Sequence, residues 1–222
     1  MGHLTLVRHG QASFGASDYD QLSELGARQC EALGRYFAER GRRFDAVLTG
    51  TLKRHGQSLE AIASTMAGLP PARATSALNE YDAEGLVRAA ASGRPIEHKP
   101  GGDRREHFRL LREGLAGWMR GELKVQGLAD WPSFRAGVAA VLDELRQSGA
   151  EQVLVVSSGG PIATAVAHVL EAPASAVVAL NLQMRNSALT ELSSTPKRHW
   201  LVSYNMLPHL DHPDRAGWVT HS

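Results

Sequence analysis

The stretch EQVLVVSSGGPI, residues 151–162, decides the fold of this chain. Residues 151–158 form an almost unbroken apolar run, which is typical of a strand buried on both faces by helices. The flanking segments, 133–148 and 161–171, place apolar residues at helical spacing. Because a helix, a buried strand and a second helix follow one another, the sequence predicts a parallel sheet between helical layers.

The same alternation extends to both ends of the chain. We expect further strands at 3–8, 44–50, 186–192 and 198–205, and further helices at 24–40 and 51–67. Ser23 is the candidate N-cap of the first of these helices, and Gly41 is a plausible stop after it. The expected fold class is therefore α/β, a three-layer αβα sandwich around a mostly parallel central sheet.

Residues 83–131 interrupt this alternation, because they are rich in Gly, Arg and Glu. Within them, 92–108 reads as irregular chain and 104–121 as a helix. We expect a helical and irregular insertion over the edge of the sheet, within a single domain that spans residues 1–222.

Composition and charge narrow the class of protein. Of 222 residues, 43% are hydrophobic and 21% are charged, the balance of a soluble globular protein. The net charge of +1 gives no reason to expect nucleic acid or a membrane surface as a partner. Cys30 is the single cysteine, so no intrachain disulfide can form, and no stretch reads as a signal peptide or membrane span. We expect a cytoplasmic protein, with a homodimer as an open alternative.

The ends of three predicted strands carry the chemistry, because ligands of open α/β sheets collect outside the carboxyl ends of the strands. The first strand ends in Arg8, His9 and Gly10, and Arg54 follows the second within a helix. The third ends in the segment 157–161, SSGGP, which opens a helix whose free N–H groups suit an anion. Two arginines, an imidazole and a helix start together predict a phosphate pocket.

Five segments in this order resemble the histidine phosphatase superfamily, also called phosphoglycerate mutase-like. They are LVRHGQAS (6–13), LSELGARQCEALG (22–34), VLTGTLKRHGQSLEAI (47–62), LNEYDAEG (78–85) and VLVVSSGGPI (153–162). The tripeptide RHG alone is weak evidence, but the ordered set covers most of the chain. The resemblance implies the phosphoglycerate mutase-like fold and a phosphoryl-transfer activity.

Carried over position by position, the resemblance implies a role for each of four residues. His9 is the nucleophile that takes the phosphoryl group, Arg8 and Arg54 clamp the phosphate, and Glu80 donates a proton to the leaving oxygen. This chemistry is self-consistent, because a neutral imidazole can attack phosphorus and arginines offset charge on the equatorial oxygens. No metal ion or other cofactor is expected.

The weaker assignments remain open. Asp82 and Glu84 lie close to Glu80, so the loop offers three candidate proton donors. Gln11 and Ser13 are candidates to hydrogen-bond the phosphate or the substrate, although polar residues after a strand are common in any loop.

Ser158 is a serious departure from the family pattern, which usually has a second histidine before the two glycines. Ser158 and Gly159 can still bind phosphate at the helix start, but a serine carries no charge. Losing a well-placed donor in such a site costs about 10²- to 10³-fold in rate. Candidates for compensation are His55, His98, His107 and His168.

The leading function is a phosphomonoester phosphatase that acts through phospho-His9 on a small metabolite or a phosphoprotein. The alternative is a phospho-ligand binding or regulatory module with little catalysis, because Ser158 replaces the histidine. A phosphoglycerate mutase-type phosphotransferase is less favoured, because the insertion shows no clear set of extra substrate clamps. The histidines near the carboxyl end, His209, His212 and His221, are expected at the surface.

Overall fold

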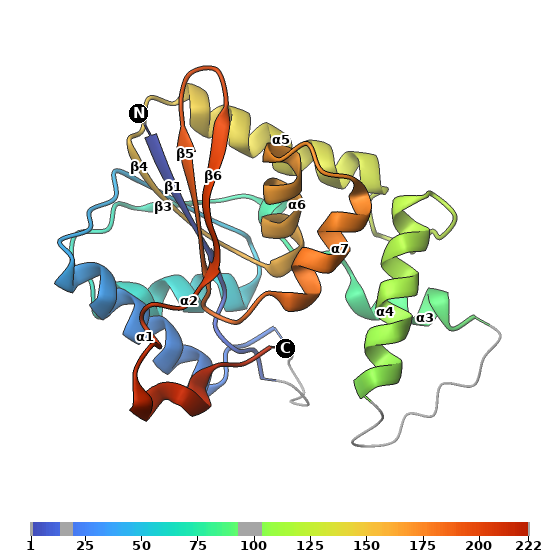
Figure 1. Ribbon diagram of the computed structural model, residues 1–222, viewed down its shortest axis with the longest axis horizontal. Helices are drawn as coiled ribbons and strands as arrows, with labels where there is room; N and C mark the ends of the chain where they lie inside the picture. Colours follow the sequence, from blue (N-terminus) through green and yellow to red (C-terminus); the bar gives the residue numbers. More distant parts are fainter. Residues whose placement is uncertain (1, 14–19, 93–103, 222) are drawn as a thin grey trace.

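The computed structural model describes residues 2–13, 20–92 and 104–221, in which a six-stranded sheet lies between two layers of helices (Figure 1). In chain order the elements are β1 (Gly2–Arg8), α1 (Glu24–Glu39), β2 (Ala46–Thr49), α2 (Lys53–Ala63), β3 (Ala72–Ala74), the 3-10 turn η1 (Ser76–Leu78), α3 (Ala83–Ala90), α4 (Arg104–Met119), α5 (Trp131–Gln147), β4 (Gln152–Ser157), α6 (Gly159–Val169), α7 (Ala174–Gln183), β5 (Leu189–Ser194), β6 (His199–Met206) and the 3-10 turn η2 (Pro213–Trp218).

The strand order is β3-β2-β4-β1-β5-β6. Strands β3, β2, β4 and β1 are parallel neighbours, whereas β5 is antiparallel to both β1 and β6. The expected α/β fold class is therefore confirmed, and the sheet is mixed because the last two strands form a hairpin. Arg8 of β1 lies opposite Ser157 of β4, so the two central strands end at the same edge.

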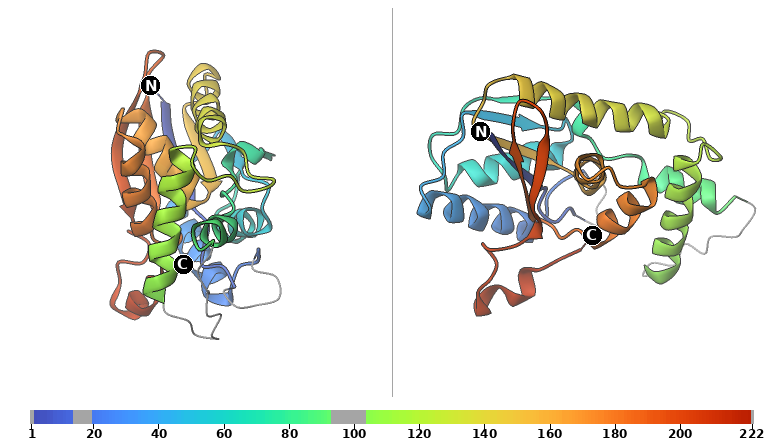
Figure 2. Two further views of the ribbon diagram at one scale, coloured as in Figure 1. Left: turned by 90° about the vertical axis from the view of Figure 1, so that its right-hand side faces the viewer. Right: turned by 45° about the horizontal axis from the view of Figure 1, so that its top comes forward.

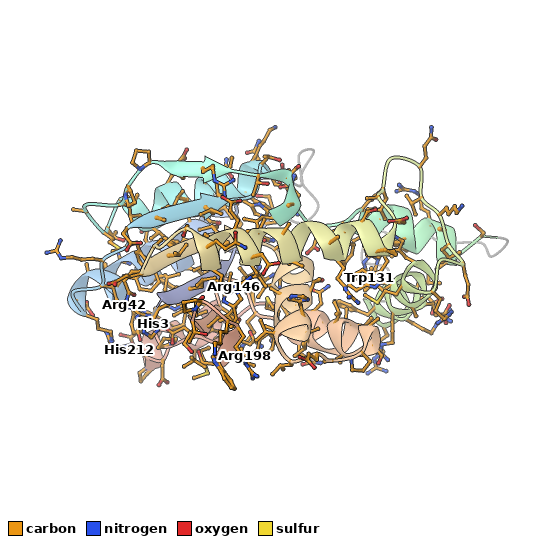
Figure 3. The ribbon with its side chains drawn as sticks, turned by 90° about the horizontal axis from the view of Figure 1, so that it is seen from above. His3, Arg42, Trp131, Arg146, Arg198 and His212 are labelled. Carbon is orange, nitrogen blue, oxygen red and sulfur yellow. The ribbon has the colours of Figure 1, made fainter. Side chains whose placement is uncertain are left out.

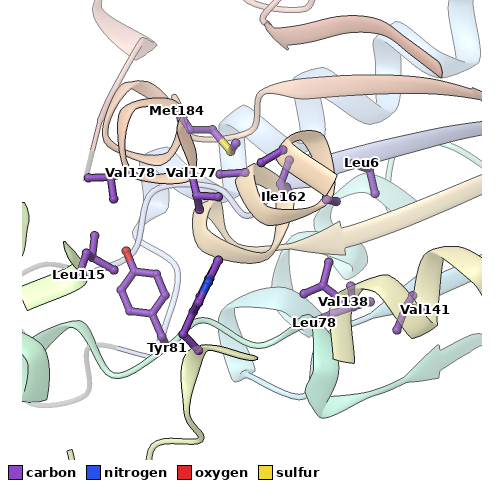
Figure 4. Close-up of a cluster of buried hydrophobic side chains, with 14 of the residues drawn as sticks. Leu6, Leu78, Tyr81, Leu115, Val138, Val141, Ile162, Val177, Val178 and Met184 are labelled. Atoms are coloured by element: carbon purple, nitrogen blue, oxygen red, sulfur yellow. The ribbon is translucent and has the colours of Figure 1, made fainter. Parts of the chain in front are cut away.

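The core lies on both faces of the sheet, as the apolar run of β4 predicts. On one face, Leu154 packs in a cluster with Phe37 of α1 and Ile62 of α2. On the other, Val155 packs in a cluster with Ile162 of α6 and residues of α5 (Figure 4). Figures 1 and 2 show these two pairs of helices on opposite sides of the strands. Among the helices that the structure describes, none has the length and apolar character needed to cross a membrane.

Most predicted elements form close to the predicted bounds. The Ser23 hydroxyl accepts the Gly26 N–H, so this serine does cap α1, and Gly41 follows the helix with φ of +60°. The second predicted helix is shorter than expected, because α2 ends at Ala63. Neither β3 nor α7 was predicted: β3 is three exposed residues paired with β2, and α7 is apolar without a clear helical stripe.

The insertion contributes α3 and α4, which pack against each other at the end of the molecule far from the amino terminus (Figures 1 and 2). Helix α4 agrees with the predicted helix, whereas α3 lies where none was expected; the irregular chain expected at 92–108 falls largely outside the described residues. Trp118 of α4 contacts Trp131, the first residue of α5, at the right-hand end of this helix in Figure 3; their ring centroids are 5.3 Å apart. Trp118 also contacts Tyr81 at 5.7 Å, which brings the insertion next to Glu80.

Candidate active site

The carboxyl ends of β1 and β4 bring the predicted site residues together. Pairing between the two strands continues one residue past β1, because the His9 N–H donates to the Ser157 carbonyl at 2.9 Å. Ser158 follows at once and is the N-cap residue of α6. The site is therefore formed where β1, α2 and the first turn of α6 meet.

His9 is a neutral imidazole with its Nε2 lone pair directed into the site. Its Nδ1 lies 2.7 Å from the Gly10 carbonyl oxygen, which can only accept, so Nδ1 carries the proton. Its Nε2 accepts the Nε–H of Arg54 at 3.3 Å. Burial, together with the charges of Arg8 and Arg54, holds the pKa of His9 well below its usual value. The ring can thus act as a nucleophile at Nε2.

The two arginines are both buried and are held by different parts of the chain. Arg54 lies in the first turn of α2, and its Nη1 donates to Asp20 Oδ1 at 2.8 Å. Asp20 also accepts the Lys53 N–H at 2.9 Å, so one carboxylate caps α2 and orients the guanidinium. Arg8 donates from Nη1 to the carbonyl of Met184, the residue that follows α7.

Glu80 reaches the site from the loop before α3. Both of its carboxyl oxygens accept the Gly160 N–H, at 3.1 and 3.2 Å, so the carboxyl lies against the first turn of α6. Gly160 has to be a glycine here, because a Cβ would lie 2.1 Å from Glu80 Oε1. Burial raises the pKa of Glu80, and the Gly160 N–H and the charges of Arg54 and Arg8 only partly oppose it. A carboxyl with a raised pKa can deliver a proton.

The structure separates the three carboxyl groups that the sequence left as candidates. Asp82 is the N-cap of α3 and accepts the Gly85 N–H at 2.8 Å. Glu84 is exposed in the first turn of the same helix. Glu80 is the member of this group that the structure places beside the two arginines and the start of α6.

The other predicted phosphate-binding residues lie in two different places. Ser158 and Gly159 lie at the start of α6. The side-chain oxygen of Gln11 instead accepts the Ser23 hydroxyl at 2.9 Å, against the start of α1. Ser13 is half-buried, and its N–H donates to the carbonyl of Gln21 at 2.8 Å. Gln11 and Ser13 therefore lie on the loop that leaves the site.

One of the four histidines considered as compensation for Ser158 lies at the site. His55 is buried, its Nε2 is 2.7 Å from Ser158 Oγ, and its ring centroid is 5.7 Å from that of His9. The remaining candidates are His168, exposed near the end of α6, His107, half-buried on α4, and His98, which lies outside the described residues.

Three residues near the site were not among the predicted site residues. Asp20 orients Arg54, as described above. Asn181 of α7 donates to the Tyr81 hydroxyl, and its Oδ1 lies so close to Gly159 that a Cβ there would be 2.2 Å away. Tyr81 could have been found as the neighbour of Glu80, whereas Asp20 and Asn181 carry no local signal.

The donor set at this site suits an anion. Arginine forks and the N–H groups of a helix start bind phosphate oxygens well. Within the described ranges there is no group of three or more His, Cys, Asp or Glu side chains that could hold a metal ion.

His209 corrects one expectation, because it is buried and not at the surface. Burial lowers its pKa to about 3, so the folded protein keeps it neutral while the unfolded chain takes up a proton below about pH 6.5. Stability due to this group is therefore complete above pH 6.5 and is lost as the pH falls. We expect His209→Gln to flatten the fall in unfolding free energy between pH 6 and 5 by about 1.2 kcal/mol, measured by urea titration. Equal slopes in the two proteins would contradict this.

Comparison with known proteins places the chain in a family. Residues 4–207 match the model of the histidine phosphatase superfamily (branch 1), whereas no protein of curated function matches the sequence. Among similar solved structures is a mycobacterial glucosyl-3-phosphoglycerate phosphatase, with a TM-score of 0.64, 23% identity, and coverage of 92% of this chain and 99% of that chain. A phosphoserine phosphatase from Entamoeba histolytica, in complex with 3-phosphoglyceric acid, has a TM-score of 0.65 and 21% identity, covering 95% and 100%. The phosphoglycerate mutase of Bacillus anthracis has a TM-score of 0.66 and 16% identity, covering 94% of both chains.

The structural likenesses are all below 25% identity and show the shared fold. The family model adds the sequence itself, because its match begins within β1 and ends just after β6. The chain therefore belongs to branch 1 of the histidine phosphatase superfamily.

Proposed function

We propose that this protein is a phosphomonoester phosphatase that works through a phosphohistidine at His9. The observation that carries the proposal is the state of His9: Nδ1 is bound to the Gly10 carbonyl, and the Nε2 lone pair is met by the Nε–H of Arg54. A nucleophile in the correct tautomer, two buried guanidinium groups and a carboxyl of raised pKa are what phosphoryl transfer requires.

In the first half-reaction, His9 Nε2 bonds to phosphorus as the bond from phosphorus to the ester oxygen breaks. Arg8 and Arg54 offset the charge that spreads over the equatorial oxygens, together with the Gly159 N–H at the start of α6. Glu80 gives its proton to the leaving oxygen, which departs as an alcohol and not as an alkoxide. The products are the free alcohol and the phosphorylated imidazole.

In the second half-reaction, water replaces the alcohol and the same groups act in reverse. The Glu80 carboxylate takes a proton from water as its oxygen bonds to phosphorus, and the bond from phosphorus to His9 Nε2 breaks. Inorganic phosphate leaves, and Glu80 is again protonated for the next cycle. Each residue thus returns to its starting state without an external donor or acceptor.

The substrate class that we propose is a small phosphorylated metabolite. The similar solved structures support it, because their names refer to glucosyl-3-phosphoglycerate, phosphoserine and phosphoglycerate. The exposed arginine face of α4 gives no support for a second anion site, because Arg109 pairs with Glu106 and Glu113 of the same helix. A phosphoprotein remains the alternative substrate.

A second candidate function is a phospho-ligand binding module with little turnover. Ser158 is the observation that favours it, because the hydroxyl supplies no positive charge where the family usually has an imidazole. The site would then bind phosphate in the ground state without stabilising the transition state. Turnover separates the two functions directly.

We expect the purified protein to release phosphate from p-nitrophenyl phosphate and from some members of a panel of sugar phosphates, phosphoserine and phosphoglycerates. Turnover should be the same with and without EDTA, and orthovanadate should inhibit it competitively, because vanadate mimics the transferring phosphoryl group. A phosphopeptide in the same panel tests the alternative substrate. Phosphate binding without release from any compound would favour the binding module over the phosphatase.

A further inference from the structure

His55 and Ser158 form a buried hydrogen-bonded pair that the steps above leave unused. Both residues are fully buried, and His55 Nε2 lies 2.7 Å from Ser158 Oγ. His55 comes from the first turn of α2, whereas Ser158 precedes α6, so the pair joins two elements that reach the site from different sides of the sheet. The ring of His9 is 5.7 Å from that of His55, between centroids.

Ser158 is an N-cap residue that does not cap its helix. A serine at this position normally accepts an N–H of the first turn. Here its side chain makes no such bond, and the Gly160 N–H is taken by the carboxyl of Glu80. The Ser158 hydroxyl is therefore available to bond with His55 and with a group in the site.

The tautomer of His55 decides what Ser158 can do. A hydroxyl has one hydrogen, so Ser158 can donate either to His55 Nε2 or to a ligand, but not to both. If Nε2 carries the ring proton and donates to Ser158 Oγ, the hydroxyl hydrogen is left to point toward a phosphoryl oxygen. If Nε2 is unprotonated, the hydroxyl donates to the ring and presents lone pairs to the anion, which is repulsive.

The surroundings of His55 suit a neutral ring in which only Nε2 makes a hydrogen bond. Burial and the charge of Arg54 lower the pKa of His55 to about 3, so the ring is uncharged at physiological pH. Its Nδ1 has no hydrogen-bond partner in the described part of the chain and packs on Gly50, where a Cβ would be 2.1 Å away. An anion beside Ser158 selects the form in which Nε2 carries the proton.

We propose that His55 is a positioning residue for phosphoryl transfer, which acts by holding the Ser158 hydroxyl as a donor to the phosphoryl oxygens. The pair thus supplies a hydrogen-bond donor at the position where the resemblance described above leads us to expect a histidine. This inference rests on the proposed phosphatase function. A purely structural alternative is that the pair ties α2 to α6, and the two roles differ in what a variant changes.

The test uses two variants of similar size at position 55. His55→Leu fills the space without a hydrogen bond, whereas His55→Gln places an amide donor where Nε2 lies. We expect His55→Leu and Ser158→Ala each to lower kcat about 10²- to 10³-fold with little change in KM, because the lost donor serves the transition state. His55→Gln should retain at least about tenfold more activity than His55→Leu. The double variant His55→Leu/Ser158→Ala should be no slower than the slower single variant, since the two residues act as a unit.

Thermal unfolding and anion binding separate the possible failures. If the pair is only a structural tie, each variant should lose activity in proportion to its loss of melting temperature. His55→Leu and His55→Gln would then be equally active when they are equally stable, and this result would overturn the inference. If the native protein turns over substrate and His55→Leu stays within about threefold of it, the inference fails while the phosphatase function stands. If the native protein hydrolyses nothing, the phosphatase function fails, and calorimetry with orthovanadate and orthophosphate decides on His55. The inference then requires that His55→Leu lose at least about 30-fold in vanadate affinity but keep its phosphate affinity.

Discussion

His9→Ala is expected to lower kcat for any phosphomonoester by at least about 10⁴-fold, the largest effect of a single change in this protein. In the proposed mechanism the imidazole supplies the nitrogen that bonds to phosphorus, and its Nε2 is the ring nitrogen that carries no proton. Phosphate binding should survive within about tenfold, since Arg8, Arg54 and the start of α6 remain. The variant therefore separates the chemical step from ground-state binding.

Three measurements on His9→Ala test this prediction. Steady-state turnover gives the loss in kcat, calorimetry with orthophosphate gives the retained affinity, and rapid quenching of labelled substrate tests for the acid-labile, base-stable phosphoenzyme. His168→Ala is the matched control, because this histidine is exposed near the end of α6 and should keep native activity and labelling. Labelling of the His9→Ala protein, or turnover within tenfold of native, would show that another residue is the nucleophile.

Topology made the central residues of the site predictable. Arg8 and His9 follow an apolar run of strand length, and Ser158 follows another, so neighbouring parallel strands bring them to one edge. Arg54 was placed by the same argument, because α2 starts shortly after β2 ends. These positions depend on where the strands end, and the pattern of apolar residues in the sequence predicts strand ends well.

The remaining residues depend on how distant elements pack, which local patterns do not report. His55 is one step along α2 from Arg54, but its contact with Ser158 follows from the rotation of α2 against the sheet. Asp20 reaches Arg54 from a loop 34 residues earlier in the chain. Helix α7 was missed because it is apolar without a stripe, and with it Asn181. Glu80 could not be separated from Asp82 until α3, which Asp82 caps, was known.

Glu80→Gln is expected to divide substrates by their leaving group. For an alkyl phosphate, the loss of the proton donor should slow turnover about 10²- to 10⁴-fold, because the alkoxide would have to leave without a proton. p-Nitrophenyl phosphate needs no such proton, so His9 should still be phosphorylated at close to the native rate. Dephosphorylation then lacks its base. The variant should therefore release about one nitrophenol per protein molecule in a burst and remain as the phosphorylated protein.

The pH dependence of turnover by the native protein tests the same assignment. Glu80 acts as an acid only when protonated, so single-turnover rates with an alkyl phosphate should fall as the pH rises through its raised pKa. His9 must be neutral, and because its pKa is lowered, the acid limb should lie at low pH and leave an acidic optimum. Glu80→Gln should remove the basic limb, whereas Glu84→Gln, on the exposed first turn of α3, should keep it. If Glu80→Gln hydrolyses an alkyl phosphate at the native rate and its pH profile keeps the basic limb, another group must be the proton donor.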